Sequence, residues 1–335
     1  MPVVEPVAGP GPRPFWSVMI PCYNGAEVLA ETLESVLAQD PGPEAMEIEV
    51  VDDHSTLDDP AAVVADLGRG RVGFHRQPHN VGASANFTTC ARRSRGDWVH
   101  ILHGDDRVLP GFYDRYRERI EACPEAVMVG SQTVMTDARG RPVAVTGPVD
   151  TDGGYVREGA FTVAALHPLR CVAVVVARRA YEEVGGFHPG LAHVNDWEMW
   201  TRLAGFGPVA WVDESLGLYR DHPGSDSSRL HRSTAYLDDC LAGIEVIAGH
   251  FEDPERRHRV QLATRRLVGD YALGVGQEMI LQGEFRLALA NAARAVRIDP
   301  SLHSWSRAAE VAGSAVAGRL GPVRDRRAQR LRREA

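Results

Sequence analysis

The sequence predicts an α/β protein in which a mostly parallel sheet is flanked by helices and followed by an all-helical region. In the first hundred residues, short apolar runs alternate with amphipathic segments, a pattern typical of a parallel sheet with crossover helices. Polar clusters follow several predicted strands, at the end of the sheet where such folds bind ligands. From about Ser233 onward strand patterns vanish and helical periodicity takes their place.

The predicted elements follow one another with short connections. Trp16–Ile20 is a strand that Pro21 stops, and Ala26–Ala38 is a helix with its apolar residues on one face. Asp59 and Pro60 supply an N-cap and a first-turn proline for a helix that ends near Leu67. Further strands are predicted at Glu47–Val51, Val72–Arg76, Trp98–Leu102 and Cys171–Ala177, and further helices at Gly82–Ser94, Arg178–Val184 and Asp196–Ala204. Residues 130–170 have no clear pattern.

These patterns divide the 335 residues into four parts. A Pro/Gly-rich lead, residues 1–14, is expected to be flexible, and residues 15–230 form the α/β domain. Residues 231–318 are helical, and Gly283–Pro300 resembles half of a tetratricopeptide-type hairpin, although one copy does not establish a repeat array. Residues 319–335 form a basic tail, with seven arginines and one aspartate between Arg319 and Arg333.

Composition excludes some classes of protein. The formal net charge of -8 argues against a nucleic-acid-binding role, because the phosphate backbone is usually met by a basic surface. The five cysteines are scattered without a CxxC pair, which favours a reducing, cytoplasmic location over a disulfide framework or a zinc site. No apolar run approaches the roughly 20 residues that span a bilayer, and the N-terminus lacks a signal-peptide pattern.

Two adjacent carboxylates, Asp105 and Asp106, follow the predicted strand Trp98–Leu102. Holding two negative charges together is unfavourable without a cation beside them. Mg²⁺ and Mn²⁺ prefer oxygen ligands and commonly bridge a carboxylate to a diphosphate. The pair therefore indicates a metal–diphosphate site, and a solvated, helix-capping turn before Pro110 remains the alternative.

Other polar residues occupy similar positions. Tyr23 can stack on a nucleobase or pack against the domain, and Asp53 can accept a hydrogen bond from a base edge or cap a turn. Asn80-Val81-Gly82 opens the helix that contains Asn86, and a helix N-terminus favours an anion.

Further along the chain, Asp196 begins a predicted helix, where it is either an N-cap or a general base, with Glu198 as the competing carboxylate. Arg220 and His222 follow in Tyr219-Arg220-Asp221-His222, a segment that could reach metal or phosphate oxygens.

Together these pieces resemble glycosyltransferase family 2 and its GT-A fold. The matching segments are VMIPCYNGAEVLAETLESVLAQ, EIEVVDDHSTLD, NVGASANF, GDWVHILHGDD, EVGGFH, NDWEMWTRLA and YRDHPGSDSS, in the order and spacing of the family over about residues 15–228. The resemblance implies an inverting transferase that moves one sugar at a time from a nucleotide-diphosphate donor, UDP-, dTDP- or GDP-linked, to an acceptor hydroxyl. Cell-surface polysaccharide, glycolipid or secondary-metabolite synthesis is the implied setting.

The resemblance also implies residue roles. Tyr23 would stack on the base, Asp53 would bind its edge, Asp106 would be the more direct ligand of Mn²⁺ or Mg²⁺, and Asp196 would be the catalytic base. The donor site is accordingly expected to contain Pro21, Tyr23, Asn24, Asp53, Asn86, Asp105 and Arg220, and the metal site Asp106, Asp105 and His222.

The chain departs from the family at two positions. His103 stands where the family often has an acid, and Asn195 stands where a Glu often precedes the catalytic aspartate. These departures keep open a catalytically silent nucleotide-sugar-binding module that recruits partners through its helical C-terminus. A dinucleotide-dependent oxidoreductase would need a G-x-G-x-x-G turn where this chain has PCYNG.

Two points remain: a nucleotidyltransferase as an alternative activity, and the role of the arginine-rich tail. A nucleotidyltransferase would need a Gly-rich basic loop after the first strand, which is not seen. The arginine-rich tail is interpreted as a solvated basic end, with peripheral contact to anionic lipid at the inner membrane face as the alternative.

Overall fold

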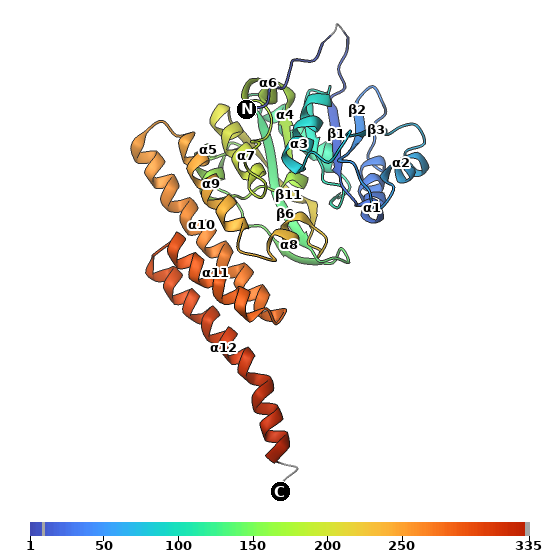
Figure 1. The fold of residues 1–335 in the computed structure, drawn as a ribbon. Coiled ribbons are helices and arrows are strands. Elements are labelled where there is room, and N and C mark those ends of the chain that lie inside the picture. The colour runs from blue at the N-terminus through green and yellow to red at the C-terminus, as the bar shows by residue number, and fades with distance from the viewer. Residues whose placement is uncertain (9–10, 332–335) are drawn as a thin grey trace. The chain divides into compact units, whose positions relative to one another are not determined.

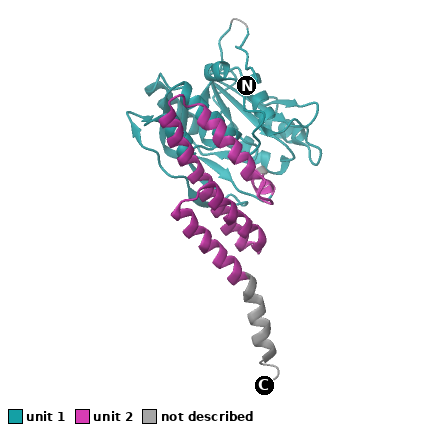
Figure 2. Ribbon diagram, turned by 60° about the vertical axis from the view of Figure 1, so that its left-hand side comes forward, with its two compact units in different colours: residues 1–223 teal, residues 224–335 magenta. Residues whose placement is uncertain are grey.

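The computed structural model describes the backbone of residues 1–8 and 11–331, and the side chains of that part other than Asp226 and residues 319–331. The chain divides into a first unit, Met1–Pro223, and a second unit, Gly224–Ala335, shown in teal and magenta in Figure 2. The division falls near the boundary predicted at residue 230. The basic tail predicted at 319–335 lies outside the described side chains.

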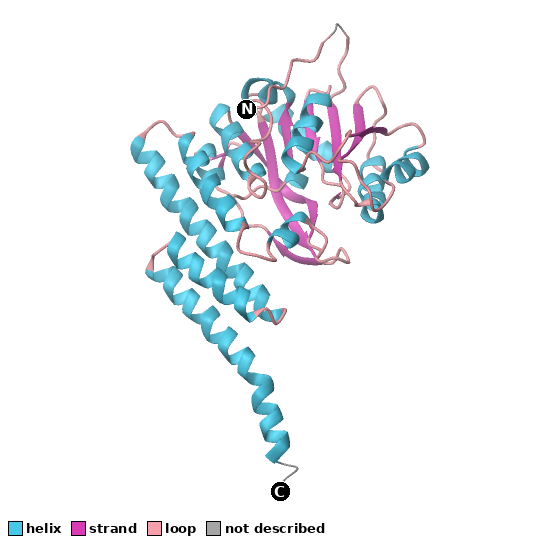
Figure 3. Cartoon of the chain, viewed as in Figure 1, coloured by secondary structure: helices cyan, strands magenta, loops and turns pink. Residues whose placement is uncertain are grey.

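The first unit is built on one mixed sheet of eleven described strands (Figures 1 and 3). Its main order is β3-β2-β1-β4-β10-β6-β11-β9-β8, while β5 pairs with β11 and β7 with β6. The strands are β1 Trp16–Cys22, β2 Met46–Asp52, β3 Gly73–Arg76, β4 Trp98–Ile101, β5 Arg107–Val108, β6 Met128–Thr136, β7 Pro142–Val145, β8 Thr151–Asp152, β9 Tyr155–Val156, β10 Val174–Ala177 and β11 Val209–Arg220.

Helices cover both faces of this sheet. They are α1 Ala26–Leu37, α2 Pro60–Gly68, α3 Ala83–Arg93, α4 Phe112–Ala122, α5 Gly159–Leu166, α6 Arg178–Val184 and α7 Asn195–Phe206. Val18 and Ile20 of β1 point into one core with α1, α2 and α4. Met19 points into the other core with α3, α5, α6 and α7. This alternation follows from the two-residue period of a strand whose two faces are both buried.

Strand directions bring distant segments to one edge. Strands β3, β2, β1 and β4 are mutually parallel, whereas β10 runs antiparallel between β4 and β6. Because β10 is antiparallel to both neighbours, β6 runs in the same direction as β4, and β11 is parallel to β6. The carboxyl ends of β1, β2, β4 and β11 therefore lie on the same edge, where ligands bind in open α/β sheets.

Most predicted elements of the first half are confirmed, including the Asp59 cap, whose side chain accepts a hydrogen bond from the Ala62 amide. The prediction that Pro21 stops the first strand was wrong: β1 continues to Cys22. The backbone of Pro21 faces the β4 side of β1, where its carbonyl accepts a hydrogen bond from the Gly104 amide. Strand β4 has already ended there, because its last residue, Ile101, pairs with Met19. The missing proline N–H therefore removes no ladder hydrogen bond.

Other predictions needed correction. The strand predicted at Cys171–Ala177 is a 3-10 turn at Cys171–Ala173 followed by β10. Strands β6 to β9 and helix α5 occupy residues 128–166, where the sequence pattern was weak. Within the lead, the Val3 carbonyl accepts a hydrogen bond from Arg92 and the Glu5 carbonyl accepts one from Arg178. The expected flexibility of the lead stays a prediction.

The second unit is helical, as predicted. Its helices are α8 Asp226–Leu230, α9 Tyr236–Gly249, α10 Pro254–Leu281, α11 Phe285–Ile298 and α12 Leu302–Leu331. The segment that resembles a tetratricopeptide hairpin forms α11, which packs against α10 and α12. Its buried Asn291 accepts a hydrogen bond from Tyr236 (2.7 Å) and so ties α11 to α9. Within the described residues, no helix has the length and apolar character needed to cross a membrane.

Candidate active site

The turn after β4 gathers three potential metal ligands. One ligand atom each from His103, Asp105 and Asp106 lies within 4.8 Å of the others. The turn is held by a backbone hydrogen bond from the Asp106 amide to the His103 carbonyl and by Thr32 of α1, whose hydroxyl donates to the Asp106 carbonyl (2.7 Å). Both aspartates were expected here from the sequence, whereas His103 was not predicted to be a ligand.

Asp106 is the most deeply buried of the three, with 1% of its surface exposed. Its Oδ1 accepts a hydrogen bond from the Arg220 amide (2.9 Å), and its Oδ2 has no hydrogen-bond partner among the described residues. Burial and the neighbouring Asp105 charge raise the pKa of Asp106 well above its usual value. A buried oxygen without a partner is unfavourable, so the carboxylate fits a cation that would complete its coordination.

Asp105 is paired with His222. The Nε2 atom of His222 lies 3.1 Å from Oδ2 of Asp105. Burial alone would raise the pKa of Asp105, but the His222 hydrogen bond and the nearby His103 and His222 hold it below its usual value. The structure thus places His222 against the acidic pair, as a partner of Asp105 outside the three-residue cluster.

Arg220 supports the acidic turn from the end of β11. Its guanidinium donates to the Asp105 carbonyl (3.1 Å) and to Glu31 of α1 (2.6 Å), and 6% of the residue is exposed. The same residue supplies the backbone amide that binds Asp106. Arg220 therefore positions the two aspartates, a contribution that the sequence pattern did not indicate.

Asp53 follows β2 and fills the anion site expected at the start of α3. Its Oδ1 accepts from the Val81 amide (2.7 Å) and its Oδ2 from the Gly82 amide (2.9 Å). The helix N-terminus thus binds a carboxylate of this chain. Burial raises the pKa of Asp53, and these two amides oppose the shift. Each oxygen keeps a second lone pair, so Asp53 can still accept a hydrogen bond from a base edge.

The other residues expected around the donor differ in what they can contact. Tyr23 is 42% exposed, as a ring that stacks on an incoming base must be. The Asn24 side-chain oxygen accepts from the amides of Thr56 and Leu57, so it holds that loop. Asn86 is 3% exposed and bonds to the Val51 carbonyl and to Gln77. Because its side-chain amide forms these hydrogen bonds inside the core, we do not assign Asn86 to contact with the donor.

Asp196 lies in the first turn of α7. Its Oδ1 accepts a hydrogen bond from the Trp197 amide (2.7 Å), and the residue is half-buried. Burial raises the pKa of Asp196, while Arg170, the Trp197 amide and His103 oppose the shift. A raised pKa strengthens a carboxylate as a base near neutral pH.

The competing carboxylate, Glu198, is bound elsewhere. It is fully buried, and its two oxygens accept from Nε and Nη2 of Arg202 at 2.8 and 3.0 Å. Arg202 also donates to the carbonyls of Val184 and Gly186. A carboxylate fixed in this pair has a structural role, so Asp196 is the better candidate base.

The pKa of one buried thiol is affected by the charges of both acidic regions. Burial, followed by the negative charges of Asp196 and Asp106, raises the pKa of the Cys171 thiol well above its usual value. All five cysteines are free and buried.

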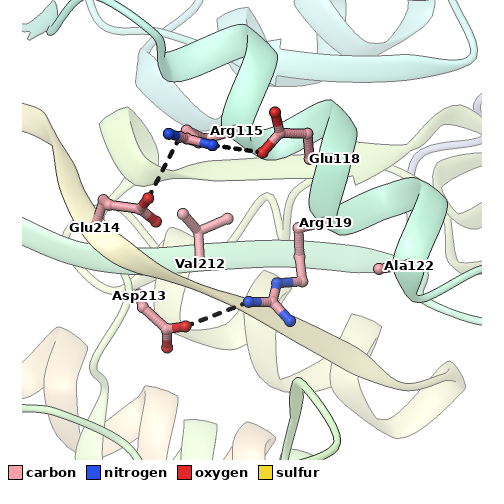
Figure 4. Close-up of a pocket in the computed structure, with 7 residues that line it drawn as sticks. All are labelled: Arg115, Glu118, Arg119, Ala122, Val212, Asp213 and Glu214. Atoms are coloured by element: carbon pink, nitrogen blue, oxygen red, sulfur yellow. Dashed lines mark hydrogen bonds and ion pairs between the residues drawn. The ribbon is translucent and has the colours of Figure 1, made fainter.

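A separate hollow of about 340 Å³ lies between α4 and β11 (Figure 4). Its charged side chains pair with one another: Arg115 with Glu118 and Glu214, and Arg119 with Asp213. None of the residues expected at the donor or metal site lines it. Because its charged side chains already pair with one another, we assign it no ligand.

Residues 17–160 match the model of glycosyl transferase family 2. This part of the chain is therefore a family 2 glycosyltransferase domain. The match covers the turn after β4 and ends before Asp196 and Arg220, so the assignments of those two residues depend on the contacts described above.

Two curated relatives have related sequences. An uncharacterized protein of Mycobacterium tuberculosis is 29% identical over 229 residues, which are 65% of this chain and 70% of that protein. The succinoglycan biosynthesis protein ExoO of Rhizobium meliloti is 30% identical over 123 residues, which are 37% of this chain. The matched part covers 34% of ExoO, about a third of its length.

Two solved structures share the fold. Residues 1–349 of Staphylococcus aureus TarS, in complex with UDP, align with a TM-score of 0.59 at 16% identity, covering 91% of both chains. The mannosyltransferase PcManGT of Pyrobaculum calidifontis, in complex with GDP-Man and Mn²⁺, aligns with a TM-score of 0.53 at 18% identity, covering 95% of this chain and 89% of that one. At these identities the likeness shows the fold, which is the expected GT-A architecture.

Proposed function

We propose that this glycosyltransferase is inverting and metal-dependent, and that it moves one sugar from a nucleotide diphosphate to an acceptor hydroxyl. The observation that carries the proposal is the buried Oδ2 of Asp106, which lies beside Asp105 and His103 and has no hydrogen-bond partner among the described residues. Cell-surface polysaccharide, glycolipid or secondary-metabolite synthesis is the proposed setting, since a curated relative is named for succinoglycan biosynthesis.

The donor would lie across the carboxyl ends of β1, β2 and β4. The exposed ring of Tyr23 is available for stacking on the base, and Pro21 and Asp53 border the same edge of the sheet. Solved structures of the fold hold UDP or GDP-Man, which supports a nucleotide-diphosphate sugar here. Asn24 would help by fixing the loop at residues 56 and 57 beside this pocket.

A divalent ion, Mn²⁺ or Mg²⁺, fits the residues of the β4 turn. Asp106 and Asp105 would hold it, and when bound it would neutralise charge on the departing diphosphate. His222 and Arg220 fix Asp105 through its carboxylate and its carbonyl, while the Arg220 amide aligns Asp106. The protein thus supplies oriented oxygen ligands before the donor arrives.

Asp196 would take the proton from the acceptor hydroxyl, which then attacks the anomeric carbon from the face opposite the nucleotide. Inversion follows from this single displacement, whose transition state would resemble an oxocarbenium ion, as in glycoside chemistry generally. The Trp197 amide orients the carboxylate, and burial raises its pKa and thus its basicity.

Asp196→Asn tests the assignment, because an amide keeps the oxygen that accepts from Trp197 but cannot act as a base. We expect its hydrolysis of UDP-, dTDP- and GDP-sugars with Mn²⁺ to fall by a factor of about 10² to 10⁴, with UDP binding by calorimetry unchanged. Asp66→Asn, at an exposed position of α2, is the matched control for charge. Near-normal turnover in Asp196→Asn would refute the base.

The same assay addresses the alternative of a silent module. Such a module would show a thermal shift with a nucleotide diphosphate and Mn²⁺, because a ligand stabilises the fold that it binds, but no hydrolysis of any sugar nucleotide in the wild-type chain.

A further inference from the structure

His103 is held in position by contacts that leave one ring nitrogen free to bind. Its ring stacks on Phe87 of α3, with centroids 4.8 Å apart and planes inclined by 22°. Phe87 in turn packs edge-on against Phe187. The Nε2 atom of His103 is buried and has no hydrogen-bond partner in the part of the chain that the structure describes. Such an atom is unfavourable unless something outside this chain satisfies it.

A second such atom belongs to a residue of the same cluster, since Oδ2 of Asp106 is also buried and has no hydrogen-bond partner among the described residues. A hydrogen bond between the imidazole and this carboxylate would satisfy both groups, yet the structure does not join them. A cation between them would satisfy both at once, because a neutral imidazole and a carboxylate are each ligands of divalent metals.

We propose that His103 is a nitrogen ligand of the cation at this turn, so that the site selects Mn²⁺ over Mg²⁺. This inference rests on the proposed function and deepens it. Imidazole suits first-row transition metals, whereas Mg²⁺ favours carboxylate, carbonyl and water oxygens. At His103 the family often has an acid, so this chain exchanges an oxygen ligand for a nitrogen ligand.

The spacing permits this coordination. Metal–ligand bonds of 2.0–2.1 Å place two ligands on opposite sides of an ion about 4.2 Å apart. The three ligand atoms lie within 4.8 Å of one another. A shift of a few tenths of an ångström, within the reach of side-chain rotation, would bring the widest pair onto one ion.

Pulsed electron paramagnetic resonance of Mn²⁺ bound to the full chain tests the proposal directly, because it detects a coordinated nitrogen without any turnover. We expect nitrogen modulation in the wild-type chain and its loss in both His103→Ala and His103→Asp. Two variants are used so that a folding defect in one does not decide the result. His222→Ala should keep the signal, and His258→Ala, at an exposed position of α10, is the matched control.

Competition titrations of Mn²⁺ against Mg²⁺ give a second measurement. His103→Ala should weaken Mn²⁺ binding by about tenfold or more and change Mg²⁺ binding less, while His103→Asp should shift the preference toward Mg²⁺. Mn²⁺ binding without nitrogen modulation, or modulation lost only in His222→Ala, would overturn the inference and leave the proposed function intact. No binding of Mn²⁺ to the wild-type chain, with or without UDP, would instead refute the metal dependence itself.

Discussion

The buried pair of Glu198 and Arg202 gives a prediction that distinguishes a stabilising carboxylate from a catalytic one on helix α7. Glu198→Gln would remove the negative charge and leave the Arg202 guanidinium, 10% exposed, facing a neutral amide. Arg202 would keep its hydrogen bonds to the carbonyls of Val184 and Gly186, but those carry no net charge. Breaking a buried pair on one side destabilises a protein by about 3–5 kcal/mol.

Helix α4 offers the matched control, since Arg117 and Glu121 form a pair with the same spacing at 2.9 Å. Those two side chains are 51% and 62% exposed, and an exposed pair of this kind contributes about 0.3–0.5 kcal/mol. Glu121→Gln should therefore barely change the free energy of unfolding. The difference between the two variants isolates the effect of burial.

Urea unfolding followed by tryptophan fluorescence is a suitable assay, because five of the six tryptophans belong to the first unit and Trp305 alone to the second. The activity of Glu198→Gln per folded molecule should stay near that of the wild type, in contrast to Asp196→Asn. A loss of less than about 1 kcal/mol, within the range of exposed pairs, would refute the description of Glu198 as a buried structural anion. So would a loss of turnover without a loss of stability.

Arg220→Lys should weaken Mn²⁺ binding by about tenfold in calorimetry, because lysine cannot reproduce the fork that reaches Glu31 and the Asp105 carbonyl; unchanged affinity would argue against a positioning role. Gly96→Ala should lower the free energy of unfolding by about 1–3 kcal/mol, since its Cβ would lie 2.6 Å from the Trp16 backbone, whereas Gly205→Ala in α7 meets nothing within 4 Å and should stabilise by about 0.5–1 kcal/mol. Asp299→Asn should lower stability at neutral pH by about 1 kcal/mol. Burial would raise the pKa of Asp299, but the hydrogen bonds from Ser304 and Ser301 hold it below its usual value. The extra stability of the wild type over Asp299→Asn should therefore be complete above the unfolded-state pKa and should vanish as pH falls through the folded-state pKa. A stability difference that persists at the lowest pH would contradict this.

The first half of the fold was predictable because local chemistry and tertiary structure agree there. Asp59 caps α2 as its sequence indicates, and β2 and β4 are short apolar runs with clear ends. Strand β11 was missed because it is irregular. Its pairing with β6 shifts register between Val212 and Gly217, and the exposed Asp213 and Glu214 interrupt the apolar pattern at that place.

The site was predictable in its position and less so in its details. The carboxyl ends of β2 and β4 identified Asp53 and Asp106 from the sequence. The hydrogen bonds that fix them come from distant residues, however, and no local pattern reveals such partners. The burial of Asn86 depends on tertiary packing in the same way. From the sequence, His103 was identified as a departure from the acid of the family and was not assigned as a ligand, although its place in the turn after a strand was a signal for that role.

The hydrogen bond from the Arg220 amide to Asp106 spans 114 positions of the chain. During synthesis the ribosome releases Asp106 long before Arg220, so the acidic turn emerges without the strand that completes it. The aspartates can acquire their final arrangement only after β11 has paired with β6. Cation affinity should therefore appear late in folding, and in a refolding experiment it would report completion of the sheet rather than formation of the turn that carries the ligands.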